Sequence, residues 1–273
     1  MKLSLTNILG VFFSISMLIF GITETLKISS VLSNIPILTK YTFLNLPSLF
    51  IVLGGILNAV FITYQPRYVG QAFYSILYLF SQSKSSAKIL EYDLGEMLTW
   101  SDYIKSDRLK ALGRLEEEHE GEVAGYLFSL MSTNYSTDDI KEFGTNHIEE
   151  HYFRQLVTVD VLRAMGGAAP SFGMFGTLFG LVVMLGQLEN PSGMGPGLAA
   201  ALITTLYGIS LARFIFYPVA EKIKNVAQLN RFREYFILEG ILLINEKKSS
   251  FYLQDRLSTY LRRDFKSYQQ SDK

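Results

Sequence analysis

Apolar residues gather in four long runs along the chain, and polar residues gather in the segments between them. A helix that spans a bilayer needs about 20 mostly apolar residues, because each residue adds about 1.5 Å against an apolar core of about 30 Å. We therefore predict an all-α membrane protein with four transmembrane helices that contact membrane lipid. The predicted spans are residues 1–26, 47–64, 168–188 and 197–217.

Two apolar stretches have another interpretation. The first run, MKLSLTNILGVFFSISMLIF, is also compatible with a signal peptide. It is longer than a typical signal-peptide core, and no pair of small residues marks a clean cleavage site, so we favour a membrane anchor. The aromatic stretch from Ala72 to Phe80 is too short for a span and favours an interfacial or packed helix.

The positions of Lys and Arg predict the orientation, because cytoplasmic segments carry an excess of these residues. Residues 65–167 and 218–273 are rich in both, whereas residues 27–46 hold only two lysines and residues 189–196 hold neither. We therefore expect a bacterial inner-membrane protein. Residues 65–167, residues 218–273 and both termini are expected to be cytoplasmic. The two short links are expected to be periplasmic.

The predicted cytoplasmic segments are helical in character. Strong helix formers run from Asp107 to Leu127. Ser136 and Asp139 have the spacing of a capping box at the start of the helix that leads into the third span. The tail is predicted to be one long helix that turns near Lys247 to Ser250 and then re-forms. A helical cytoplasmic domain and a helical cytoplasmic tail therefore accompany the four spans.

The composition narrows the function classes. Charged residues make up 18% of the 273 residues, whereas soluble domains usually carry about a quarter. The formal net charge is zero, so no nucleic-acid partner is expected. The chain has no cysteine, which excludes disulfides and cysteine-based metal sites. No constellation of nucleophile and base is recognisable, so we expect neither an enzyme nor a bound cofactor.

The predicted spans have no central acidic group. Glu24 lies at the outer end of the first span, and Arg213 lies near the inner end of the fourth. Proteins that couple ion flow to work usually place an ionisable group inside the membrane despite its energetic cost. Either this chain moves no ions, or a partner protein supplies the carboxylate.

The third and fourth spans carry small and polar residues of special interest. Their glycines and alanines would let helices approach closely, either within one chain or in a bundle of several chains that forms a pore. A proline in the third span frees a carbonyl, with a simple kink as the alternative. Threonine hydroxyls could line a polar path or bond back to their own helix. The candidate ion-path residues are Pro170, Thr177, Thr204, Thr205 and Pro218.

The run from Arg163 to Ile223 resembles the MotA/TolQ/ExbB superfamily, and within it most closely the MotA/PomA branch. The motifs AAPSFGM, GTLFGLV, ALITTLYG and YPVAEKI carry the resemblance, which extends over about residues 45–261. It implies the A subunit of a flagellar stator, an ion-driven generator of torque. TolQ/ExbB-like energisers of outer-membrane work are the alternative, but those relatives have one span before the cytoplasmic loop and this chain has two. A scaffold or defence-system protein is a further alternative.

The resemblance also implies partners. A pentamer of this chain would surround two copies of a MotB/PomB-type subunit, which has a single span with an aspartate and a peptidoglycan-binding domain. That aspartate would be the missing carboxylate, and Pro170 and Pro218 occupy the positions of two functionally important family prolines. Thr177 and Thr205 resemble sodium-driven members, so we favour sodium over protons as the transported ion.

The rotor protein FliG is the second implied partner. Family members contact it through an Arg and a Glu that lie eight residues apart, and Arg108 and Glu116 have this spacing. Ala111 replaces a usual glycine, so Arg114 and Glu117 are alternatives, and a purely solvated charged helix is a third reading.

Two other patterns are weaker. The sequence HIEEH from His147 to His151 matches a zinc motif, but no third ligand is evident, and we favour a polar helix face. The glycine-rich segment from Gly193 to Gly197 links two spans and lacks the strand and helix context of a dinucleotide site.

Overall fold

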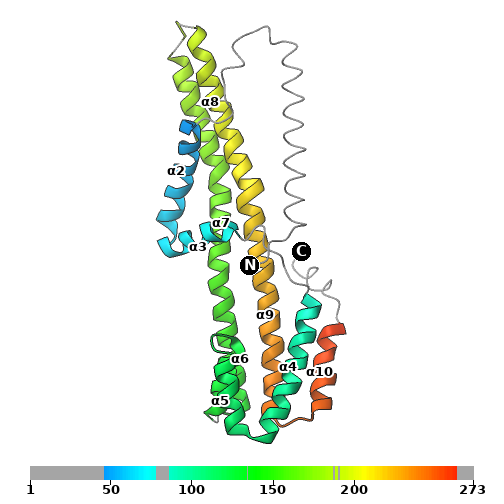
Figure 1. Cartoon of the computed structure of the whole chain (residues 1–273). Helices are drawn as coiled ribbons and strands as arrows, with labels where there is room; N and C mark the ends of the chain where they lie inside the picture. Colours follow the sequence, from blue (N-terminus) through cyan, green and yellow to red (C-terminus); the bar gives the residue numbers. More distant parts are fainter. Residues whose placement is uncertain (1–45, 78–85, 134, 187, 190, 263–273) are drawn as a thin grey trace. The chain divides into compact units, whose positions relative to one another are not determined.

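The computed structural model describes residues 46–262 except 78–85, 134, 187 and 190, and over these residues it is built from helices (Figure 1). The predicted first span and residues 27–45 of the link after it lie outside the described residues. The helices are α2 (Leu46–Thr63), α3 (Pro66–Ile76), α4 (Ser86–Ser106), α5 (Arg108–Glu118), α6 (Val123–Ser132), α7 (Thr137–Leu185), α8 (Pro191–Ser210), the π-helix η3 (Leu211–Phe216), α9 (Tyr217–Asn245) and α10 (Ser250–Arg262).

The described residues form two compact units. The first, which we call the membrane unit, holds residues 46–77 and 156–224. The second, which we call the polar unit, holds residues 86–155 and 225–262. The long helices α7 and α9 contribute residues to both units, and each unit has a hydrophobic core of its own.

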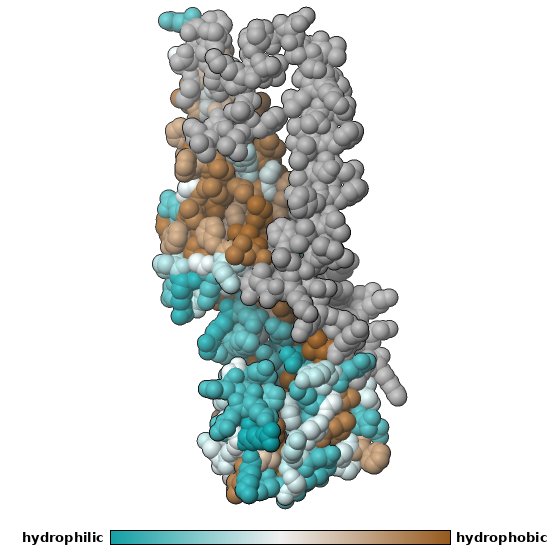
Figure 2. Space-filling model, in the orientation of Figure 1, coloured by the Kyte–Doolittle hydropathy of each residue, from teal (hydrophilic) through white to brown (hydrophobic). Residues whose placement is uncertain are grey.

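Two helical stretches are long and apolar enough to cross a membrane, Thr137–Val182 and Gly197–Asn245. Only 33% and 22% of their most apolar windows are buried by the chain itself. Figure 2 shows apolar side chains gathered over the membrane unit. Helix α2 matches the predicted second span and is also apolar, although it is shorter. Apolar helices whose surfaces the chain leaves uncovered are expected where lipid or another subunit covers them.

The core of the membrane unit forms where α2, α7, η3 and α9 meet. Val52, Ile56 and Val60 follow one another at a spacing of four residues, so they lie on one face of α2 and are buried together. The same helix reaches α8 through Ser48, whose hydroxyl donates a hydrogen bond to the Ala200 carbonyl at 3.3 Å. Phe172 of α7 packs directly on Gly55, where an added side chain would collide with the Phe172 ring unless the ring moved.

The polar unit is organised around α6. This helix is as apolar as a short membrane segment, yet most of its residues are buried, including Leu127 and Phe128. Trp100 of α4 packs edge-on against Phe128, with ring centroids 5.2 Å apart. The turn between α5 and α6 depends on Gly121, whose φ of 80° is unfavourable for residues with a side chain. Helix α6 is therefore a core helix and not a span.

Two sequence predictions about helix ends are confirmed in the polar unit. The Ser136 hydroxyl accepts the Asp139 N–H at 3.1 Å, and the Asp139 carboxylate accepts the Ser136 N–H at 3.2 Å, which is a reciprocal capping box at the start of α7. The tail turns after Asn245, where Lys247 has a φ of 59°, and α10 begins at Ser250. The start of α7 therefore follows from the capping box, and the start of α10 follows from the turn at Lys247.

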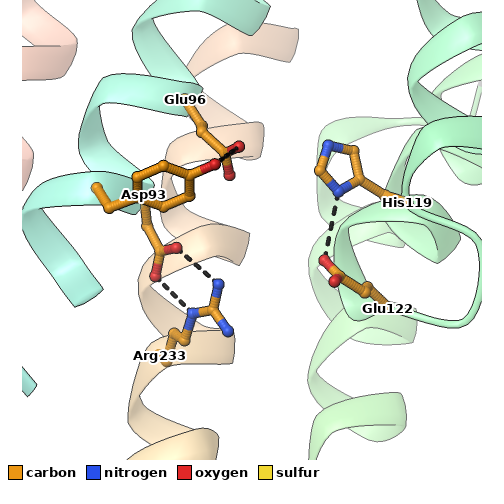
Figure 3. Close-up of polar contacts among 6 residues, drawn as sticks. Asp93, Glu96, His119, Glu122 and Arg233 are labelled. Atoms are coloured by element: carbon orange, nitrogen blue, oxygen red, sulfur yellow. Dashed lines mark hydrogen bonds and ion pairs between the residues drawn. The ribbon is translucent and has the colours of Figure 1, made fainter. Parts of the chain in front are cut away.

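Two polar contacts link elements of the polar unit (Figure 3). The Asp93 carboxylate on α4 accepts hydrogen bonds from Nε and Nη2 of Arg233 on α9, at 2.6 and 2.7 Å. Asp93 is only 1% exposed. His119, which follows α5, lies 3.3 Å from a carboxylate oxygen of Glu122, just before α6. The first contact joins two helices that are distant in sequence, and the second is local to the turn between α5 and α6.

Candidate ion path and rotor-facing helix

Helices α7 and α8 touch through their backbones. A side chain on Gly173 would lie 2.9 Å from the Thr204 carbonyl oxygen, and one on Gly180 would lie 2.7 Å from the Ala201 methyl group. One on Gly208 would collide with the Ala169 carbonyl oxygen. The small-residue faces of both helices are therefore used within one chain, as the intramolecular alternative predicts. These faces of α7 and α8 are therefore covered within the membrane unit.

Thr204 lies inside this close contact. It is 1% exposed, its hydroxyl donates to the Ala201 carbonyl at 2.7 Å, and its side chain fills the space over Gly176. A hydroxyl that bonds to its own helix satisfies a polar group in an apolar setting. Within the membrane unit the Thr204 side chain acts as packing between α7 and α8.

Thr177 and Thr205 are placed differently, since both are partly exposed. The Thr205 hydroxyl donates across the helix pair to the Gly173 carbonyl at 3.3 Å. The Thr177 hydroxyl donates to the Met174 carbonyl of its own helix at 2.6 Å. Thr177 lies four residues, or about one turn, after Gly173. Each hydroxyl uses its proton on a carbonyl, so the lone pairs of its oxygen remain available to a cation.

Tyr217, the residue before Pro218, packs on α7 about one turn before Pro170. Pro170 lies inside α7, which continues through it, and Pro218 is the second residue of α9. The Tyr217 ring packs on Gly166, where a side chain would lie 3.0 Å from the ring. Gly166 is the residue whose carbonyl the proline leaves without its usual partner. The structure thus brings the region before Pro170 next to the start of α9.

The π-helix η3 was not foreseen from the sequence. It joins α8 to α9 without a break, and the Tyr217 N–H donates to the Ala212 carbonyl, five residues earlier. Nothing in the residues LARFIF marks a π-helix. Helix α8 also begins earlier than the predicted span, at Pro191, since a proline is well accommodated in the first turn of a helix.

The predicted rotor-facing residues lie on α5. The Arg108 guanidinium donates to the Asn245 side chain at 2.9 Å, and Asn245 in turn donates to the Thr137 hydroxyl at 3.0 Å. Glu116 is partly exposed. Arg114, the alternative arginine, is exposed and pairs with Glu118 at 2.8 Å. Arg108 therefore has a structural contact in addition to any external one.

The residues of the HIEEH segment are occupied by other contacts. His151 lies 2.9 Å from a Glu234 carboxylate oxygen, and the Glu149 carboxylate accepts from Arg231 and from Tyr235. His147 stacks on Tyr126 with ring centroids 4.3 Å apart. Among the described residues no group of three or more potential ligands could hold a metal. These contacts favour the polar helix face over a zinc site.

Comparison with known proteins identifies the family. The family model of the MotA/TolQ/ExbB proton channel family matches residues 116–233. The chain is 30% identical over 223 residues to YtxD of Bacillus subtilis, an uncharacterised protein, covering 82% of this chain and 81% of YtxD. It is 30% identical over 227 residues to motility protein A of Treponema phagedenis, covering 80% of this chain and 83% of that protein. The chain belongs to the MotA/TolQ/ExbB proton channel family.

The fold agrees with this assignment. The structure of MotAB from C. jejuni matches with a TM-score of 0.76 at 22% identity, and the match covers 95% of this chain and 96% of that one. The chain is thus a MotA-like membrane protein of a channel family and not of an enzyme family. The matched family region contains Glu116 and every candidate ion-path residue, whereas Arg108 precedes it.

Proposed function

We propose that this MotA-like chain is the A subunit of a flagellar stator that converts a transmembrane ion gradient into torque. The observation that carries the proposal is a family-type α7–α8 pair whose apolar part, residues 168–185 of α7 together with α8, has no carboxylate of its own. Between residues 168 and 217 the chain has one acidic residue, Glu189, which lies in the connection before α8. A coupling carboxylate must then come from a partner, as expected for an A subunit that works with a B subunit.

The proposed partner is a MotB/PomB-type subunit with a single span, an aspartate in that span and a peptidoglycan anchor. Five copies of this chain would surround two copies of the partner, with both termini of this chain in the cytoplasm. The faces available for these contacts are the exposed apolar ones. On α7 they include Phe175, Leu178 and Val182, which are 49%, 58% and 68% exposed. The glycine faces are already used within the chain.

The proposed transported ion is sodium. A sodium ion must replace lost water molecules with other oxygen ligands, whereas a proton needs only the carboxylate. The Thr177 and Thr205 hydroxyls donate their protons to carbonyls and keep oxygen lone pairs free. Both are partly exposed beside the α7–α8 contact. They are the threonines of this pair best placed to offer oxygen ligands next to a partner's carboxylate.

The proposed rotor contact lies on α5, with Arg108 and Glu116 facing FliG. Charged side chains on an exposed helix guide association in a way that depends on salt. Arg114 and Glu117 lie on the exposed surface of the same helix and are the alternative pair. Contact at this helix would turn the proposed rotation of the pentamer into rotation of the motor.

The experiment is swimming speed as a function of external sodium. A strain that lacks its own stator genes would express this chain together with the neighbouring B-type gene, at constant ionic strength and membrane potential. We expect motility to return and to rise with sodium. The Thr177→Ala and Thr205→Ala variants are expected to require several-fold more sodium for half-maximal speed.

A matched control is available in α2. The Thr63 hydroxyl bonds to the Ala59 carbonyl at 2.9 Å on an exposed surface, so Thr63→Ala should leave the sodium dependence unchanged. Motility that ignores sodium would overturn the ion assignment and leave the stator assignment in place. No motility, with both proteins in the membrane and with a FliG that accepts the stator, would favour a TolQ/ExbB-like role.

A further inference from the structure

The most unusual charge in the membrane unit belongs to Arg213 of η3. It is the one charged residue between Gly197 and Tyr217, a segment that is otherwise apolar or small. Its side chain is exposed on the surface of the unit. A guanidinium next to apolar side chains at this position is costly unless an anion or water compensates it. The charge therefore needs water or an anion beside it.

Among the described residues Arg213 has an aromatic partner and no acidic one. The Arg213 guanidinium lies over the Tyr217 ring, 5.7 Å from its centroid, which is within the range of a cation–π contact. The same ring packs on Gly166 of α7. No carboxylate within the described part of the chain forms an ion pair with Arg213. The guanidinium is thus positioned by Tyr217 while its fork of N–H donors stays open.

Exposed apolar side chains near Arg213 offer a surface for the acyl chains of a lipid. Ile209, Arg213 and Tyr217 follow one another at a spacing of four residues, which puts them along one face of the continuous helix. Ile209 is 48% exposed and Phe214, next to the arginine, is 59% exposed. The basic residues that flank the end of the span begin only with Lys222. A phosphate on Arg213 would therefore have acyl chains beside these apolar side chains.

We propose that Arg213 and Tyr217 bind the phosphate of an anionic lipid headgroup at the membrane surface nearest α9. The planar guanidinium presents parallel N–H donors that match two phosphate oxygens, and the long side chain can reach the headgroup level. Arg213 lies in the π-helix that joins α8 to α9, and Tyr217 follows it directly. Such π-turns are frequent at functional sites. The proposal concerns lipid and goes beyond the proposed stator function.

The test measures lipid preference of the full-length chain in membranes. The chain would be reconstituted, with its B-type partner, in phosphatidylcholine that contains trace spin-labelled phosphatidylglycerol or spin-labelled phosphatidylcholine. The fraction of motionally restricted label gives the relative association of the two lipids. We expect a preference for phosphatidylglycerol that Arg213→Gln reduces by about fivefold, the effect of one basic residue near a headgroup. Arg213→Lys should keep most of it, because the charge remains.

Arg163 is the matched control. It is also an exposed arginine of the membrane unit, but it already pairs with Glu221 at 3.2 Å. Arg163→Gln should leave the lipid preference unchanged. If Arg213→Gln does not accumulate in the membrane, Tyr217→Leu replaces it and should lower the preference about twofold, because the charge of Arg213 remains while its cation–π contact is lost.

Three results would overturn the proposal. The first is a wild-type protein without preference for phosphatidylglycerol, and the second is a preference that survives Arg213→Gln. The third is full displacement of the lipid by excess inorganic phosphate, which would assign the site to free anions. If the preference survives Arg213→Gln and the variant also dissociates into smaller oligomers in pure phosphatidylcholine, Arg213 pairs with another subunit instead.

Discussion

The guanidinium of Arg233 donates two hydrogen bonds to the carboxylate of Asp93, and this carboxylate is almost completely buried. The pair joins α4 to α9, 140 residues apart in sequence. Removing one member of such a pair leaves a buried charge without compensation. The contact therefore fixes α4 against α9 more firmly than the exposed ion pairs of the same unit.

The first prediction follows from this pair. Arg233→Gln is expected to lower the free energy of unfolding by about 3 kcal/mol, because the Asp93 carboxylate stays buried without its cation. Thermal unfolding of the full chain in detergent would measure the change. Arg114→Gln removes an exposed pair with Glu118 and should cost about 0.5 kcal/mol. Similar losses in both variants would contradict the special role of Asp93.

The second prediction concerns the contact between α7 and α8. Gly180→Ala places a methyl group against the backbone of Ala201, 2.8 Å from its nitrogen, and should destabilise the chain by about 1–3 kcal/mol. Gly54→Ala in α2 is the matched control, because nothing lies within 4 Å of the added methyl group. The control should be neutral or stabilising, since alanine favours a helix. The measurement is the midpoint temperature of thermal unfolding for each variant. Equal midpoints for Gly180→Ala and Gly54→Ala would show that the contact between α7 and α8 contributes little to stability.

The third prediction is a pH dependence. Burial lowers the pKa of His147, and repulsion from His151 lowers it further. Because the unfolded chain then binds a proton more readily, the contribution to stability is full above the ordinary histidine pKa of 6.5 and is lost as the pH falls below it. His147→Phe keeps the stacking on Tyr126 and should weaken the loss of stability between about pH 7 and pH 5.5.

Comparison of variants isolates this effect from other titrating groups. Burial raises the pKa of Glu234, and His147 is not among the causes of that shift, so Glu234 contributes equally to the wild type and the His147→Phe variant. The pKa of Glu150 is lowered first by its hydrogen bond with Arg154 and to a smaller extent by the charge of His147, so only this smaller part changes with the variant. Tyr126→Phe keeps both the histidine and the stacked ring and should show the wild-type dependence. An unchanged pH profile in His147→Phe would mean that other groups account for it.

The fourth prediction separates the two roles of Arg108. Asn245→Ala removes the hydrogen bond to Arg108 but leaves its charge, and should cost about 1 kcal/mol of stability while motility persists. Arg108→Ala removes the charge as well and should reduce swimming strongly if Arg108 contacts the rotor as proposed. Swimming speed, normalised to the amount of protein in the membrane, is the measurement. Equal losses in the two variants would assign Arg108 a structural role only.

Local features of the fold were predictable, because short stretches of sequence determine them. Apolar runs predicted the helices α2, α7 and α8, and the spacing of Ser136 and Asp139 predicted the capping box that begins α7. The turn before α10 was also predictable from its residues. The helices, the capping box and the turn each depend on residues that lie within one or two helical turns of one another in the sequence.

Contacts between distant residues were not predictable. The sequence shows small residues on both α7 and α8 but not which surface each one meets, so the internal contact of Gly173 with Thr204 remained one of two alternatives. The Asp93–Arg233 pair joins residues that nothing in the sequence relates to each other. The separate placement of Thr204 and Thr205 also depends on the tertiary contact, although the two residues are adjacent.

The backbone contact of α7 and α8 has a mechanical consequence. Carbonyl groups and glycine Cα atoms of the two helices meet without intervening long side chains, so there is no flexible layer in which one helix could slide along the other. Tightly packed protein interiors have low compressibility and transmit strain. A sideways force on α7 or α8 would therefore move the two helices together as one rigid unit. Bending would occur beyond the ends of the glycine contact.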